Sequence, residues 1–193
     1  MKSIQWLSCV LLGAACSVAC GGHDFGEEQL DSTQQASSIH LKGGPSSEPA
    51  FTDNGLTLSV SGELSGLGNQ NITVNLDATG VPRATCTNPA GSTQPPGQNP
   101  ASVTLSGTQH IAAGEIKNGT VPFSLTSAGP ESPIRGAPDC PNRKWTEAIT
   151  DIAFTSATIT VTQGGNSLTV VCTFSPATSD GSVPASQVEC TSS

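Results

Sequence analysis

Apolar and polar residues alternate strictly in several short runs of the chain after Phe51. The runs cover residues 56–60, 72–77, 103–105 and 121–125, and a further strand is expected at about 147–154. A period of two is typical of strands that bury one face of an antiparallel sheet. Pro122 would point outward in its run, and it predicts an edge strand because proline has no N–H for a ladder.

The clearest pattern lies near the end of the chain. Residues 158–162 alternate, Gly164-Gly165-Asn166 follows, and residues 168–174 alternate again. A Gly-Gly turn between two alternating runs predicts a β-hairpin.

About seven short strands without helical periodicity predict an all-β fold for residues 51–193. We expect an antiparallel immunoglobulin-like (Greek-key) β-sandwich, with a closed barrel as the alternative. A chain of this length can bury its own hydrophobic core.

The segments between these runs have a different composition. Residues 20–50 are rich in Gly, Ser, Gln and Glu and predict a flexible linker. Two long proline-rich loops are expected at 88–100 and 127–144, and loops of this length are usually functional or pinned. Asn118-Gly119 predicts a tight turn.

Residues 1–19 predict a signal peptide. Lys2 is followed by an apolar stretch and then by small residues before Cys20. The stretch is too short to span a bilayer. Its end resembles a bacterial lipobox, in which the cysteine carries the lipid; Cys16 and Cys20 both compete for this role, and ordinary cleavage after Ala19 is the alternative.

Cysteine parity favours lipidation at Cys20. Lipidation there leaves Cys86, Cys140, Cys172 and Cys190, an even set that can pair completely in an oxidising compartment. We expect Cys86–Cys140 to join the two long loops and Cys172–Cys190 to fasten the C-terminal tail. A Cys86–Cys172 bridge is the main alternative.

The charge balance excludes one class of partner. Seven Lys and Arg residues face fifteen Asp and Glu residues, for a formal net charge of −8. Nucleic-acid binding requires a basic footprint, which this chain lacks. Its acidity also disfavours direct binding to anionic lipid surfaces.

No catalytic constellation stands out. The Gly-x-Ser-x-Gly motif of serine hydrolases is missing, and His110 is the one histidine after Phe51. Glu147 and Asp151 would share a face of a regular strand, but about 13 Å apart, too far for paired-acid chemistry. The sequence therefore predicts no enzyme and no cofactor.

Metal binding has equally little support. Zinc sites use several closely spaced His or Cys ligands. Calcium bound by Asp139, Glu131 or Asp180 would lack the usual loop pattern. We expect no metal.

Three short motifs resemble recurring features of a group of small exported bacterial proteins. They read TCTNP at 85–89, PGQNP at 96–100, and CPN at 140–142 followed by WT at 145–146. The resemblance covers most of residues 55–175. It implies bacterial export and a shared β-domain, and it implies no activity.

The two long loops are the expected binding surface, since loops on a rigid scaffold commonly carry recognition. The candidate binding residues are Asn88, Gln98, Asn99, Asn142 and Trp145.

Together these features predict an exported, lipid-anchored protein of the cell envelope with a recognition or structural role. It would be anchored to a membrane by a lipid at Cys20 and would contact a protein or surface ligand through its loops. The alternatives are an exported hydrolase that uses dispersed carboxylates and a plainly secreted, non-lipidated binding protein.

Overall fold

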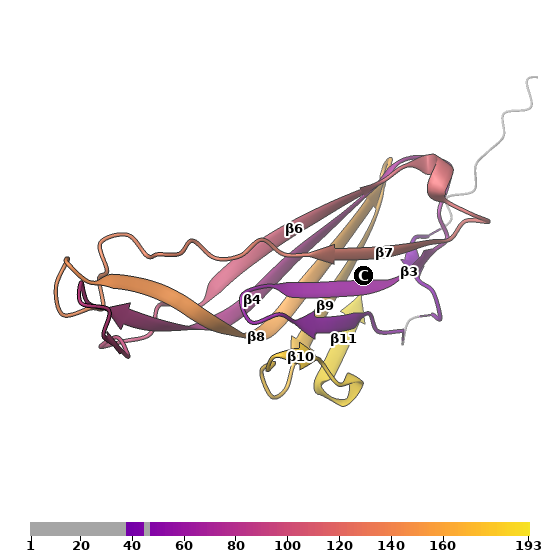
Figure 1. The fold of residues 1–193 in the computed structure, drawn as a ribbon. Helices are drawn as coiled ribbons and strands as arrows, with labels where there is room; N and C mark the ends of the chain where they lie inside the picture. Colours follow the sequence, from indigo (N-terminus) through magenta and orange to yellow (C-terminus); the bar gives the residue numbers. More distant parts are fainter. Residues whose placement is uncertain (1–37, 45–46) are drawn as a thin grey trace, which may run out of the picture. The chain divides into compact units, whose positions relative to one another are not determined.

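The computed structural model describes residues 38–44 and 47–193. The predicted signal peptide at 1–19 and the lipid site at Cys20 lie outside the described residues. The described chain consists of antiparallel strands and two short 3-10 turns, η1 (Ala113–Glu115) and η2 (Ala185–Gln187), as Figure 1 shows. The all-β prediction is confirmed. No helix among the described residues has the length and apolar character needed to cross a membrane.

The first sheet is organised around one central strand, β3. Its five strands are β1 (His40–Leu41), β2 (Ala50–Asp53), β3 (Leu58–Ser65), β7 (Val121–Thr126) and β10 (Gly181–Ser182). Among the described strands β7 pairs with β3 alone, which confirms the edge position predicted from the exposed Pro122. The tight turn at Asn118-Gly119 before β7 is also confirmed, with φ of 52° and 71°.

The second sheet contains the longest strands. Its members are β4 (Ile72–Thr87), β5 (Thr93–Gln94), β6 (Val103–Ile111), β8 (Thr146–Gln163), β9 (Asn166–Phe174) and β11 (Val188–Ser192). They run in the order β11-β9-β8-β4, and β6 and β5 also pair with β4. Gln163 pairs with Asn166, so Gly164-Gly165 is the two-residue turn of the predicted hairpin.

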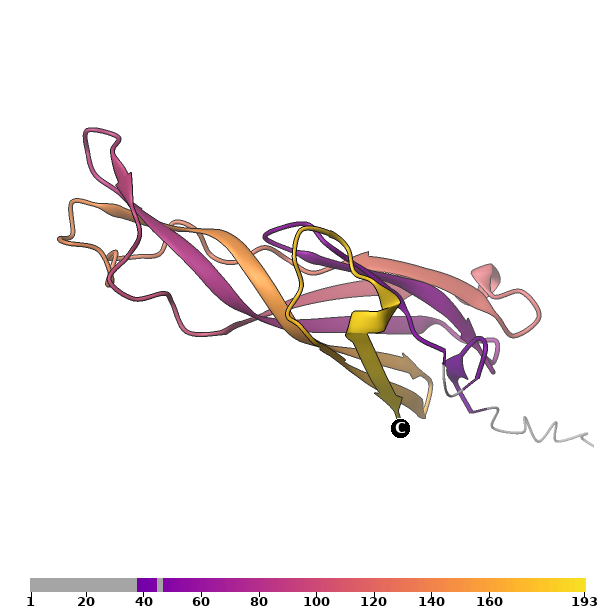
Figure 2. The same cartoon turned by 90° about the horizontal axis from the view of Figure 1, so that it is seen from below.

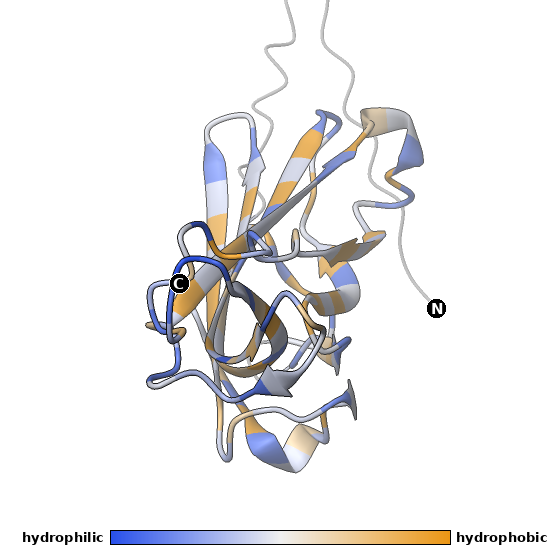
Figure 3. Ribbon diagram, turned by 60° about the vertical axis from the view of Figure 1, so that its left-hand side comes forward, coloured by the Kyte–Doolittle hydropathy of each residue, from blue (hydrophilic) through white to orange (hydrophobic). Residues whose placement is uncertain are grey.

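The core lies between the two sheets (Figure 2). Hydrophobic and hydrophilic residues alternate along the strands (Figure 3), and the apolar side chains point inward. Phe51 of β2 meets Phe174 of β9 edge to face, with ring centroids 5.0 Å apart. The β-sandwich is thus confirmed, while the immunoglobulin-like Greek-key connectivity stays a prediction.

The described domain begins before Phe51. Ile39 and Leu41 are buried in the core, and β1 pairs with β3. The predicted linker at 20–50 therefore includes residues that belong to the sheet. Two apolar residues around His40 are too short a run to show a period of two.

Both predicted disulfides are present. Cys86 joins Cys140, and Cys172 joins Cys190. The second bridge connects residues that lie opposite each other on β9 and β11, with Cα atoms 4.1 Å apart.

Strand β8 is one continuous element, although the pattern predicted two separate strands. The pairing register between β8 and β4 shifts at two points, where Thr150 and Thr155 have no partner residue on β4. Their hydroxyls donate to the carbonyls of Arg83 and Thr79, each at 3.2 Å. These two β-bulges shift the alternation twice, which is why the sequence pattern is interrupted within one strand.

Candidate functional site

Strands β4 and β8 continue past the first sheet at one end of the domain (Figure 1). We call residues 84–102 and 128–149 the tip, and the rest of the described domain the body. The tip contains the ends of both strands, β5 and nearly all of the two predicted loops. Ala84, Cys86 and Ala137 are buried here but are not part of the main core cluster.

The two loops of the tip are joined to each other. The Cys86–Cys140 disulfide links the end of β4 to the second loop, with Cα atoms 5.6 Å apart. The Gly97 N–H of the first loop donates to the Asp139 carbonyl at 2.9 Å. One covalent bond and one hydrogen bond therefore hold the loops as a single surface.

Glu147 of β8 binds the second loop through both its side chain and its backbone. Its side chain is fully buried, and its Oε2 accepts the Asp139 N–H at 3.3 Å. Its backbone carbonyl accepts the Ile134 N–H at 2.7 Å. Oε1 has no hydrogen-bond partner within the described part of the chain.

The predicted binding residues differ in their surroundings. Asn88 is structural, since its Oδ1 accepts the Ser92 N–H at 2.8 Å. Gln98 and Asn99 are exposed. Asn142 and Trp145 share a turn in which the Trp145 N–H donates to the Asn142 carbonyl at 3.1 Å.

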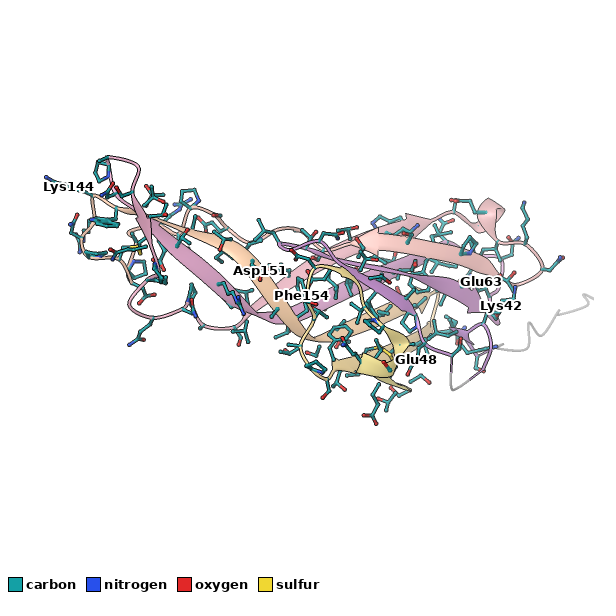
Figure 4. All side chains as sticks on the ribbon, turned by 60° about the horizontal axis from the view of Figure 1, so that its bottom comes forward. Lys42, Glu48, Glu63, Lys144, Asp151 and Phe154 are labelled. Atoms are coloured by element: carbon teal, nitrogen blue, oxygen red, sulfur yellow. A yellow bond between two sulfur atoms is a disulfide. The ribbon has the colours of Figure 1, made fainter. Side chains whose placement is uncertain are left out.

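Asn142 is exposed and Trp145 is half-buried outside the main core cluster. The Asn142 Oδ1 accepts the Lys144 N–H at 3.0 Å. Lys144 itself lies at the far end of the tip, opposite the Lys42–Glu63 ion pair of the body (Figure 4).

A shallow cavity of about 480 Å³ opens on the second loop. It is lined by Arg135, Gly136, Ala137, Pro138, Cys140, Asn142 and Arg143. The two arginines did not stand out in the sequence pattern. The signal that could have found them is their position on either side of Cys140 in a loop already expected to be pinned.

Two further cavities lie on the body. One of about 410 Å³ is mostly apolar and lies between β1 and the pair β9 and β11. Another of about 410 Å³ includes His110, an exposed residue whose Nδ1 is 3.1 Å from the Thr73 hydroxyl. Neither cavity is lined by a predicted binding residue.

A buried polar network connects the two sheets at Asp53. The Thr178 hydroxyl donates to its Oδ2, and the Gly55 N–H donates to its Oδ1 at 2.9 Å. The Phe154 N–H donates to the same Thr178 hydroxyl at 2.9 Å. Burial raises the pKa of Asp53, the two hydrogen bonds oppose the rise, and the charges of Asp180 and Asp151 add to it.

The other predicted acidic groups do not form a site. Glu147 is buried and Asp151 is partly exposed, because the bulge at Thr150 puts them on opposite faces of β8. The same-face prediction is wrong because the strand is irregular. Glu131 pairs with Arg135 at 2.8 Å. Within residues 38–44 and 47–193, no three His, Cys, Asp or Glu side chains are grouped to hold a metal ion.

Comparisons with protein-family models, curated proteins and solved structures find no match to this chain. The resemblance to a group of exported bacterial proteins stays a prediction.

Proposed function

We propose that this protein is exported, lipid-anchored at Cys20, and has a non-enzymatic recognition role at the cell envelope. Two disulfides on an all-β scaffold are typical of proteins outside the cytosol. The lipobox-like segment before Cys20 supports the anchor. Two lipid chains would be needed for stable attachment to a membrane.

The observation that carries the recognition role is the construction of the tip. Its loops expose Gln98, Asn99 and Asn142, yet the backbone around them is fixed by the Cys86–Cys140 bridge. Exposed polar groups on loops that are already ordered bind with a smaller entropic cost than those on mobile loops. The tip is therefore the proposed binding surface.

A hydrolase that uses carboxylates has less support. Asp53 is the described carboxyl group with a raised pKa, which is a mark of functional acids. However, it is 2% exposed, both its oxygens accept hydrogen bonds, and it lines none of the three cavities above. Its position suits a structural role between the sheets.

The binding role can be tested with labelled protein on isolated cell envelopes. The test variant removes three exposed amides of the tip, Gln98→Ala, Asn99→Ala and Asn142→Ala. We expect at least a severalfold loss of bound protein, because these side chains are exposed hydrogen-bonding groups of the two loops.

The matched control removes the same three amide types from the exposed turns of the body, Asn69→Ala, Gln70→Ala and Asn166→Ala. It should bind envelopes as wild type does. Equal binding by the tip variant and the control would show that the tip is not the recognition surface.

The anchor is tested separately by metabolic labelling with a palmitate analogue in cells that produce the protein. Wild type should be labelled and Cys20→Ser should not. Equal labelling of both would reject Cys20 as the lipid site and would favour lipidation at Cys16. Absence of label on wild type would reject the anchor and favour a plainly secreted protein.

A further inference from the structure

The cavity beside the Cys86–Cys140 disulfide has an unusual charge for this acidic protein. Arg135 and Arg143 both line it, and none of its lining residues is acidic. The whole chain carries a formal net charge of −8. Two guanidinium groups around one cavity therefore make a locally basic site on an acidic protein.

The arginines keep most of their hydrogen-bonding capacity. Arg135 donates through Nε to Glu131, and its side chain is 91% exposed. Arg143 makes no hydrogen bond or ion pair with the described part of the chain. The terminal nitrogens of both groups are thus available to a ligand.

The cavity floor is held in a fixed conformation. Gly136 and Ala137 have positive φ of 78° and 41°, and the Ala137 side chain is buried. The Ala137 N–H donates to the Ile134 carbonyl at 3.3 Å, and the Cys140 N–H donates to the Ala137 carbonyl at 3.2 Å. A left-handed alanine is costly and is found where the surrounding structure enforces it, often at binding sites.

We propose that this cavity binds an oxyanion, the carboxylate or phosphate group of a ligand. A guanidinium presents a planar fork of donors that matches two oxygens of either group. Asn142 adds an amide, whose Oδ1 already accepts the Lys144 N–H and whose Nδ2 can donate. The inference deepens the recognition role proposed above, since it gives the chemical class of the ligand at the tip.

Isothermal titration calorimetry on the full chain tests the site with two probes, citrate for carboxylates and inorganic pyrophosphate for phosphates. We expect wild type to bind at least one probe and the affinity to fall as salt is added. Binding of one probe alone identifies the group that the cavity prefers. Binding of neither overturns the proposal.

The variants Arg135→Gln and Arg143→Gln should each weaken binding about tenfold, because a hydrogen bond to a charged group is lost. Arg83→Gln is the matched control, since it removes the same charge from an exposed residue of the body on β4. It should change the affinity by less than about twofold. An equal loss in Arg83→Gln would mean that only the net charge matters, and the site would be wrong.

The outcome is separable from that of the recognition role. If the amide variant of the tip loses envelope binding while both arginine variants bind the probes like wild type, recognition stands and the oxyanion site is wrong. If probe binding depends on the two arginines but the amide variant of the tip binds envelopes like wild type, the oxyanion site stands and the recognition role is wrong.

Discussion

In the body, apolar side chains from two sheets pack against each other, and Phe51 meets Phe174 between them. The tip buries a smaller set, Ala84, Ala137, Glu147, Ile149 and the Cys86–Cys140 bridge, and its loops are fixed by backbone hydrogen bonds. The body is therefore stabilised mainly by burial of apolar surface. The tip is ordered mainly by a cross-link and hydrogen bonds. Substitutions in the two regions should therefore differ in how much they lower the free energy of unfolding and in which amides they expose to hydrogen exchange.

Phe154→Ala should have the largest effect on the body. Phe154 is fully buried in β8, and its truncation should lower the free energy of unfolding by about 3–5 kcal/mol. Urea denaturation measures the loss. Val171→Ala is the control on the same sheet, since Val171 is 41% exposed, and it should cost less than about 0.5 kcal/mol. Similar losses for both would contradict the core position of Phe154.

Removal of the tip disulfide by Cys86→Ser with Cys140→Ser should cost about 2–4 kcal/mol. It should also speed hydrogen exchange at the Ile134 amide, which the loop holds against β8. The control, Cys172→Ser with Cys190→Ser, should leave exchange at Ile134 unchanged. Unchanged exchange in the tip variant would mean that hydrogen bonds alone order the loop.

Asp53 should make the stability of the body depend on pH. Burial raises its pKa above the ordinary value of 3.8, so the folded chain holds this proton more tightly than the unfolded chain. The resulting stabilisation is present below 3.8 and is lost as pH rises through the raised pKa. The stability of wild type relative to Asp53→Asn should therefore fall as pH rises from that value. A flat difference in thermal unfolding between the two across this range would contradict the raised pKa.

Glu131→Gln should have the smallest effect on stability and a clear effect on binding. Its ion pair with Arg135 is exposed, so the loss should be less than about 0.5 kcal/mol. The freed guanidinium should strengthen citrate binding severalfold in calorimetry. Glu63→Gln breaks the exposed pair with Lys42 in the body and should leave citrate binding unchanged. Tighter binding in both variants would point to net charge instead of the cavity.

Much of the body could be predicted from local sequence because alternation reports directly on one buried face. The hairpin at Gly164-Gly165 is an example. The extent of β4 could not be predicted, since Pro82 interrupts the run and proline usually excludes a central strand. The structure explains this exception: β6 ends its pairing at Gly80, so Pro82 has a neighbour on the β8 side alone.

The tip was predictable in part. The Cys86–Cys140 pairing followed from the position of each cysteine beside a long loop, and it is confirmed. The cavity could not be predicted, because Arg135 and Arg143 lie in a loop without periodicity. Their positions depend on long-range contacts such as the one between Gly97 and Asp139.

The two β-bulges of β8 have a consequence for how its gene could change. Thr150 and Thr155 each add one residue to β8 that β4 does not match. Loss of either codon would leave the neighbours of the removed threonine opposite the same residues of β4, so Glu147 would still point inward and the strand would lose one bulge. Loss of a codon for a residue that has a partner, such as Ile152, would instead turn every residue on one side of it to the opposite face. Single deletions should therefore be tolerated at Thr150 or Thr155 where they are not tolerated at Ile152.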